Sequence, residues 1–168
     1  MELPKRKQIR LPDYDYSQSG AYFVTICTQN RRCVLAQIVG RDDPGAPCAE
    51  CRLLPYGKIV ERYVLSIPVA YPGVLLEKHC IMPNHIHLLL KVQTDDIRRA
   101  ESSRPTQLLP RIIAAMKRFS NRDAGEKLWQ TGYYEHIIRD ENDFLTRWQY
   151  IDQNPARWVE DEYFGEER

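Results

Sequence analysis

Apolar residues recur along the chain with two different periods, which predict alternating strands and helices. Short runs dense in β-branched and aromatic residues are typical of strands, and runs with apolar residues at i, i+3 and i+4 are typical of amphipathic helices. The strands are expected at residues 21–28, 74–80, 85–92 and 128–138, with a shorter one at 33–38. The helices are expected at residues 55–67, 110–123 and 143–154, the last one capped by the acidic run that begins at residue 140.

The main elements follow the order strand, helix, strand, strand, helix, strand, and then one more helix. This βαββαβ order predicts the ferredoxin-like arrangement, an α+β fold in which an antiparallel sheet carries two helices on one face. The extra C-terminal helix bears Tyr150, and we expect it to lie near the sheet. A length of 168 residues fits a single domain over residues 1–168, with its core at about 20–158.

The two ends of the chain differ in charge. Residues 1–19 form a basic arm that contains Lys5, Arg6 and Lys7, whereas residues 159–168 form an acidic tail. The tail is expected to pack loosely from Trp158 onward. The sequence has no apolar run long enough for a membrane span and an odd number of cysteines, five, so we expect a cytoplasmic protein with reduced thiols and no membrane partner.

A basic segment between residues 98 and 122 stands out on a chain whose net charge is only +1. In the helix predicted there, Arg111, Arg118 and Arg122 share the side opposite the apolar stripe, and Lys117 lies beside them. We call Arg111, Arg118 and Arg122 the basic ridge. Such a ridge is typical of a phosphate-binding surface on nucleic-acid-binding proteins. An ordinary solvated helix face is an equally good interpretation at this point.

The cysteine pair Cys48 and Cys51 has CxxC spacing, but no second pair of cysteines or histidines completes a zinc set. We therefore expect it to lie in a surface turn.

The strand at 85–92 begins with His85-Ile86-His87, which holds two of the four histidines of the chain. Side chains alternate across a strand, so both imidazoles are expected to project from the same face. Paired imidazoles suit a divalent metal or a phosphate. A hydrogen-bonded structural role is as good an interpretation of this spacing alone.

Tyr150 and Asn154 lie one turn apart on the last predicted helix and share a polar flank with Asp143 and Arg147. A phenol with an ordinary pKa of about 10 is a poor nucleophile, but a cation close by stabilises the phenolate. Tyr150 could then attack a phosphate that the two histidines and a metal hold, and Asn154 could complete the metal site. On spacing alone, a tyrosine on a helix flank is more often a packing residue.

Three sequence motifs along the chain extend this interpretation. They are Met82-Pro83-Asn84-His85-Ile86-His87-Leu88-Leu89, the run from Trp129 to Asp140 that contains Tyr133-Tyr134-Glu135-His136, and Tyr150-Ile151-x-x-Asn154-Pro155. Together they resemble the single-tyrosine HUH transposases, and in particular the branch of REP-associated tyrosine transposases. The resemblance covers residues 20–158 and implies the same ferredoxin-like core.

The resemblance implies specific roles for residues of this chain. His85 and His87 match the family's metal ligands, Tyr150 matches its nucleophile, and Asn154 lies where the family has a polar residue beside the metal. The implied activity is cleavage and rejoining of single-stranded DNA near hairpins, with Mg²⁺ or Mn²⁺ and a 5′-phosphotyrosine intermediate. His136 matches a motif position to which we assign no role.

The implied partner is single-stranded DNA with hairpin structure, and the enzyme would act as a monomer or a homodimer. The basic ridge, Lys117 and the arm residues Lys5, Arg6 and Lys7 would contact phosphates. The aromatic residues Tyr22, Tyr133 and Tyr134 are candidates for stacking on unpaired bases.

Two other functions are considered. A histidine-triad nucleotide hydrolase would need a third histidine at position 89, where the chain has Leu89. A DNA-binding module that has lost cleavage remains an alternative, although the histidine pair and the tyrosine are both present.

Overall fold

The computed structural model describes residues 19–40, 49–93 and 108–164, and these contain one four-stranded antiparallel sheet in the order β4-β5-β1-β6. The strands are β1 (Gly20–Cys27), β4 (Val74–Ile81), β5 (His85–Val92) and β6 (Tyr134–Ile138). In this order each strand pairs with neighbours that run the opposite way, and the two crossovers are made by helices. This is the predicted ferredoxin-like arrangement, and the predicted α+β fold class is confirmed.

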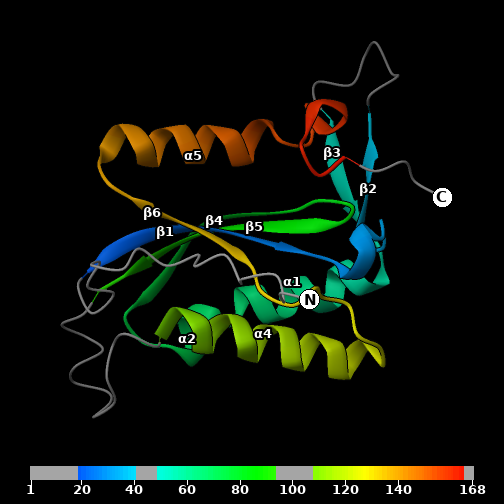
Figure 1. Ribbon diagram of the computed structural model, residues 1–168, viewed down its shortest axis with the longest axis horizontal. Helices are drawn as coiled ribbons and strands as arrows, with labels where there is room; N and C mark the ends of the chain where they lie inside the picture. Colours follow the sequence, from blue (N-terminus) through cyan, green and yellow to red (C-terminus); the bar gives the residue numbers. More distant parts are fainter. Residues whose placement is uncertain (1–18, 41–48, 94–107, 165–168) are drawn as a thin grey trace, which may run out of the picture.

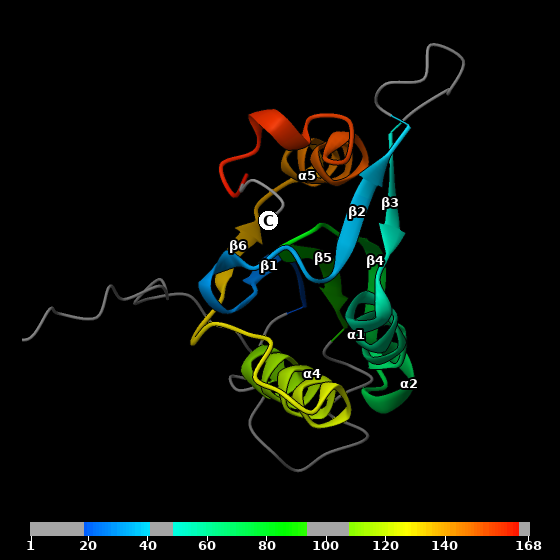
Figure 2. The same ribbon diagram turned by 90° about the vertical axis from the view of Figure 1, so that its right-hand side faces the viewer.

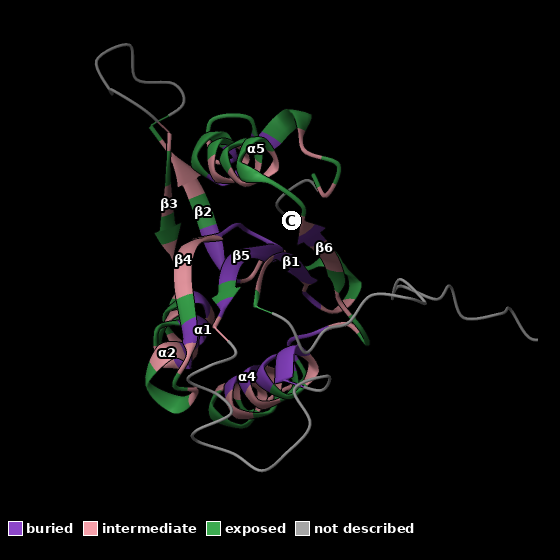
Figure 3. Cartoon of the chain, turned by 90° about the vertical axis from the view of Figure 1, so that its left-hand side faces the viewer, coloured by how far each residue is buried: buried purple, intermediate pink, exposed green. Residues whose placement is uncertain are grey.

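Helices cover both faces of the sheet (Figure 1). The first face carries α1 (Pro55–Leu65), α2 (Ile67–Ala70) and α4 (Leu108–Ala124), and α5 (Glu141–Gln153) lies over the other face. Because strand side chains alternate, Val24, Ile26 and Leu88 pack toward α1 and α4, whereas Phe23 and Leu89 pack toward α5. The central strands β1 and β5 are therefore buried on both sides (Figure 3).

The sequence predicted most element bounds to within a few residues, with two differences. The strand expected at 128–138 is ordered as a strand only from Tyr134, because a turn at Gly132 (φ 82°) interrupts it, and Trp129 makes only an isolated bridge to Thr28. The helix expected at 55–67 ends at Leu65, and a separate short helix, α2, begins at Ile67 with Pro68 in its first turn.

A two-stranded ribbon of β2 (Ala36–Val39) and β3 (Glu50–Leu53) rises beside the C-terminal end of α5 (Figure 2). The sequence predicted a short strand close to β2 and missed β3. The prediction of a surface turn at the CxxC pair is wrong for Cys51, which lies in β3 with its side chain partly buried. Cys48 lies outside the described residues.

The prediction of a loosely packed tail is wrong for the described part of that segment. Trp158 begins the short helix η3 (Trp158–Glu160) and is only 3% exposed. The chain then returns over the sheet, so that Asp161 and Tyr163 contact residues of α5 and β5. Trp158, the buried aromatic residue of this segment, is the anchor of this return.

The described helices include none that is long and apolar enough to cross a bilayer.

Substituting Gly57 with Ala is expected to lower the free energy of unfolding by about 1–3 kcal/mol, the range for an overpacked site. Gly57 lies where α1 meets the segment before β2, and an added Cβ would be 2.0 Å from the carbonyl oxygen of Leu35. Urea denaturation measures the change. Lys58→Ala on the exposed side of the same helix is the control and should stay within about 0.5 kcal/mol of the unsubstituted protein. Equal stability of the two variants would contradict the close approach.

Candidate functional site

His85 and His87 project from β5 into the layer between the sheet and α5, and both are fully buried. In the ladder with β1, His87 lies directly opposite Thr25 and His85 opposite Cys27. Residues directly opposite each other in an antiparallel pair point to the same face. The prediction that the two imidazoles share a face is therefore confirmed, and their Nε2 atoms lie 2.9 Å apart.

The hydrogen bonds around His85 determine which of its nitrogens carries the proton. Asn84 places its Oδ1 2.9 Å from His85 Nδ1, while its Nδ2 donates to the carbonyl oxygens of Tyr163 and Arg31. An amide oxygen only accepts, so His85 Nδ1 donates and His85 Nε2 has a free lone pair. The Pro83-Asn84 turn thus orients the first histidine toward the second.

Thr25 orients the second histidine, because its Oγ1 lies 2.9 Å from His87 Nδ1. A hydroxyl both donates and accepts, so Thr25 is compatible with either tautomer of His87. Because His85 Nε2 is unprotonated, His87 Nε2 donates to it and Thr25 Oγ1 donates to His87 Nδ1. A ligand between the rings would need the lone pairs of both Nε2 atoms, and His87 would then carry its proton on Nδ1 and donate it to Thr25 Oγ1.

Burial keeps both imidazoles neutral. Desolvation lowers the pKa of His85 to about 3, with a smaller effect from the nearby Arg31 guanidinium. Desolvation also lowers the pKa of His87, and the adjacent His85 lowers it further. Neutral imidazole is the form that binds a metal, so these two side chains are ready to act as ligands at neutral pH.

Helix α5 presents Tyr150 and Asn154 above the histidines. Asp140 caps this helix by accepting a hydrogen bond from the Asp143 amide, as predicted, and Ile151 anchors the helix in the sheet. The ring of Tyr150 lies 5.2 Å from the ring of His87 between centroids. Asn154 is 4% exposed, and its Oδ1 is buried with no hydrogen-bond partner.

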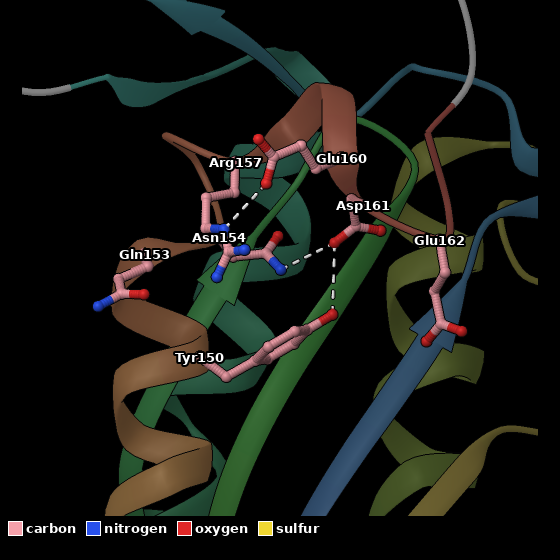
Figure 4. A pocket seen from close by; sticks show the side chains of 7 residues that line it. All are labelled: Tyr150, Gln153, Asn154, Arg157, Glu160, Asp161 and Glu162. Carbon is pink, nitrogen blue, oxygen red and sulfur yellow. Dashed lines mark hydrogen bonds and ion pairs between the residues drawn. The ribbon is translucent and has the colours of Figure 1, made fainter.

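Asp161 joins this group from the C-terminal segment, and the sequence did not predict it. Its carboxylate accepts hydrogen bonds from Asn154 Nδ2 at 2.8 Å and from the Tyr150 hydroxyl at 3.4 Å (Figure 4). Ligand atoms of His85, His87 and Asp161 all lie within 4.8 Å of one another. The arrangement therefore offers two imidazole nitrogens and a carboxylate close to the tyrosine hydroxyl.

The environment of Tyr150 disfavours its phenolate. Burial raises the pKa of Tyr150 to about 12, and the negative charges of Asp161 and Glu162 add to this effect. Without a compensating positive charge, Tyr150 stays protonated at neutral pH.

Two pockets flank Tyr150. One, of about 300 Å³, is lined by Asn154, Asp161 and neighbouring residues of α5 and the C-terminal segment (Figure 4). The other, of about 270 Å³, opens over His87 and is lined by Arg147 and Tyr134 among others. Arg147 lies above the Phe23 ring at 5.3 Å, and its buried Nε makes no hydrogen bond but lies 3.6 Å from the Asp143 carboxylate.

The predicted DNA-contacting residues lie elsewhere. Arg111, Arg118 and Arg122 are exposed on α4, which is on the opposite face of the sheet from Tyr150 (Figure 1). Lys117 donates to the carbonyl oxygens of Gln130 and Gly132 and so supports the turn before β6. Burial lowers its pKa to about 8. Lys5, Arg6 and Lys7 lie outside the described residues.

The aromatic candidates for base stacking have different environments. Tyr22 is 1% exposed and packs in the core below the sheet, so the prediction that it stacks on bases is wrong. Tyr134 is 48% exposed at the rim of the pocket over His87, and Tyr133 packs partly against the core. His136 pairs with Asp143 at 2.8 Å and fastens β6 to the start of α5.

Comparisons with known proteins were made on sequence and on structure. No family model matches the chain. An uncharacterized Haemophilus influenzae protein is 29% identical over 175 residues, covering 95% of this chain and 93% of its own length. A second Haemophilus influenzae protein, named "Putative REP-associated tyrosine transposase", is 26% identical over 148 residues, covering 85% of this chain and 74% of its own.

Among solved structures, a REP-associated tyrosine transposase bound to a REP hairpin superposes with a TM-score of 0.59. That match has 18% sequence identity and covers 88% of this chain and 73% of the other. The chain resembles the REP-associated tyrosine transposases. The predicted resemblance is thereby confirmed, and the shared fold is the four-stranded sheet with its helices.

Proposed function

We propose that the protein cleaves and rejoins single-stranded DNA by a metal-dependent reaction in which Tyr150 forms a 5′-phosphotyrosine intermediate. One observation supports this proposal most strongly. The Tyr150 hydroxyl lies beside a cluster of two buried histidines, His85 and His87, and the half-buried Asp161, which are ligand types for a divalent cation. The resemblance to REP-associated tyrosine transposases supports transposase-type DNA processing as the setting.

The residues present fit a divalent cation such as Mg²⁺ or Mn²⁺. The two Nε2 atoms face each other, the Asp161 carboxylate supplies negative charge, and the Asn154 Oδ1 is a buried acceptor without a donor. We propose His85, His87 and Asn154 as ligands, as the sequence predicted, with Asp161 as a fourth. When bound, the cation polarises the phosphate and offsets the Asp161 charge that raises the pKa of Tyr150.

The residues of this chain then perform the chemistry in defined steps. The Tyr150 oxygen attacks phosphorus, and the bond from phosphorus to the ribose 3′-oxygen breaks. The tyrosine proton leaves to water in the adjoining pocket, and the 3′-oxygen takes a proton from solvent. The free 3′-hydroxyl of another strand attacks the phosphotyrosine in the reverse reaction, which restores the Tyr150 hydroxyl.

The pocket over His87 is the proposed position of the cleaved nucleotide. The Arg147 guanidinium lies one helical turn before Tyr150 and lines this pocket, where it can bind the phosphate that is attacked. Tyr134, exposed at the rim, can stack on an unpaired base.

The basic ridge would contact a different part of the DNA. Because α4 lies across the sheet from Tyr150, Arg111, Arg118 and Arg122 are not positioned to bind the phosphate that Tyr150 of the same subunit attacks. We propose that they, together with Lys5, Arg6 and Lys7, hold more distant phosphates of a hairpin or its flank. Such contacts raise affinity without reading sequence.

The experiment that tests the proposal is a covalent-adduct assay. The protein is incubated with labelled single-stranded DNA that contains a hairpin, in the presence of Mn²⁺ or Mg²⁺. A labelled band that survives denaturing electrophoresis is expected, and a metal chelator should prevent it. DNA binding without an adduct over many hairpin substrates would instead support a binding module that does not cut.

Thr25→Val is expected to weaken Mn²⁺ binding by about 10–100-fold, the usual effect of losing the partner that orients a metal-binding histidine. Valine has the shape of threonine without the hydroxyl that bonds His87 Nδ1. Manganese titration followed by electron paramagnetic resonance measures the affinity. Thr25→Ser keeps the hydroxyl and should bind nearly as well as the unsubstituted protein, so equal loss in both variants would contradict the orienting role.

A further inference from the structure

Three sulfur atoms converge at the edge of the sheet beside the histidines, and the proposed DNA chemistry uses none of them. The Sγ of Cys51 in β3 lies 3.6 Å from the Sδ of Met82, and the Sγ of Cys80 in β4 lies 3.7 Å from the same Sδ. These three residues, Cys51, Cys80 and Met82, are called the sulfur cluster. Cys80 and Met82 are two residues apart at the end of β4, whereas Cys51 lies in β3, a separate segment that meets them only in the fold.

The two cysteine thiols of the cluster also interact with each other. A hydrogen bond from the Cys80 thiol lowers the pKa of Cys51. The same bond, together with burial, raises the pKa of Cys80. The two thiols thus interact with each other as well as with the Met82 thioether.

The spacing of the sulfurs suits a single metal ion. A soft ion bound at about 2.3 Å to each of two sulfurs holds them about 3.8–4.0 Å apart. The two separations of 3.6 and 3.7 Å from Met82 Sδ are slightly shorter, so a small outward movement of the side chains would admit the ion. Met82 is fully buried, while both cysteines are partly exposed and give access from solvent.

We propose that Cys51, Cys80 and Met82 form a binding site for a soft monovalent cation of the Cu(I) class. Two thiolates and a thioether are the ligands that such an ion selects, whereas a thioether is a poor ligand for Mg²⁺ or Mn²⁺. Binding exchanges the thiol protons for the metal and involves no change of oxidation state. The site is thereby chemically separate from the pair of imidazoles.

The position of the sulfur cluster links it to the rest of the fold. Cys80 lies opposite His87 in the ladder between β4 and β5, so their side chains share a face. Cys51 belongs to the β2–β3 ribbon, which is paired separately from the main sheet. A metal held by all three sulfurs would join the ribbon to the sheet beside the histidines and stabilise the folded chain.

The test is a titration of the reduced full-length protein with Cu(I), without oxygen, in competition with a chromophoric Cu(I) chelator. The protein is expected to take one equivalent from the chelator, to develop ultraviolet thiolate-to-copper absorption, and to melt at a higher temperature. Each single variant of the cluster is expected to lose both the bound equivalent of Cu(I) and the rise in melting temperature. These variants are Cys51→Ser, Cys80→Ser and Met82→Leu. Cys33→Ser changes a cysteine that lies outside the cluster and forms no disulfide, and this variant should retain both.

The variants also distinguish this site from others on the chain. If Cys51→Ser lost the bound copper while Cys80→Ser and Met82→Leu retained it, the copper would be assigned to the CxxC pair and the proposal would be overturned. Retention in all three would assign it elsewhere, such as the imidazoles, with the same consequence. Met82→Leu conserves volume, so its fold should survive even if a serine variant is unstable. Failure of the unsubstituted protein to compete with the chelator would also overturn the proposal.

Discussion

Tyr150→Phe is expected to eliminate the covalent protein–DNA adduct while Mn²⁺ binding and DNA binding remain. The change removes only the hydroxyl, which is the proposed attacking atom. The ring, which packs edge-on against Phe23 at 5.8 Å and against His87 at 5.2 Å, is retained. Loss of a nucleophile lowers turnover by at least about a thousandfold, because no other group replaces its covalent step.

Denaturing electrophoresis with hairpin-containing single-stranded DNA measures the adduct, and a binding assay on the same DNA measures affinity. Tyr134→Phe is the matched control, since Tyr134 is an exposed tyrosine at the rim of the same pocket. It should keep the adduct, because a phenyl ring still stacks on a base. An adduct that persists in Tyr150→Phe would assign the nucleophile to another residue.

The parts of the site that the sequence predicted are those set by local periodicity. The two-residue period of a strand placed His85 and His87 on one face, and the helical period placed Tyr150 and Asn154 one turn apart. The order of the elements predicted the sheet, and α5 then had to bring the tyrosine to one of its faces. These relations need only neighbours along the chain and the topology.

The parts of the site that the sequence did not predict depend on contacts between segments that are distant in the chain and share no periodic pattern. Asp161 follows a short helix in a polar segment, and nothing in its neighbourhood distinguishes it from the acids on either side. Its place beside Tyr150 results from Trp158, whose burial turns the chain back over the sheet. Thr25 was predicted as an ordinary strand residue, and its role appears only from the register of β1 against β5.

For the basic ridge, the sequence correctly predicted which side chains share one side of the helix, but it did not predict where that helix lies relative to the candidate site. Arg111, Arg118 and Arg122 are exposed on one side of α4, as the helical period requires. The period does not tell which face of the sheet α4 covers. The structure places this helix away from Tyr150, so in the proposed reaction any phosphates bound at the ridge of the same subunit would be distant from the bond that Tyr150 attacks.

Asp161→Asn is expected to weaken Mn²⁺ binding by at least about 100-fold, more than the ~10–100-fold effect of losing an outer hydrogen-bond partner. The substitution removes the one negative charge in the cluster of His85, His87 and Asp161 while it keeps the size of the side chain. Electron paramagnetic resonance titration with Mn²⁺ gives the affinity, and the adduct assay gives the activity. The adduct should fall in parallel and recover in part at high Mn²⁺ concentration.

Glu162→Gln is the matched control, because Glu162 is the adjacent acid and also raises the pKa of Tyr150. It lies outside the ligand cluster, so its loss should leave Mn²⁺ affinity unchanged. The two variants distinguish two roles for Asp161. It could bind the metal, and it also accepts a hydrogen bond from the Tyr150 hydroxyl at 3.4 Å. If Asp161→Asn lost the adduct but bound Mn²⁺ normally, Asp161 would act on the tyrosine proton, and the metal would depend on the two histidines and Asn154.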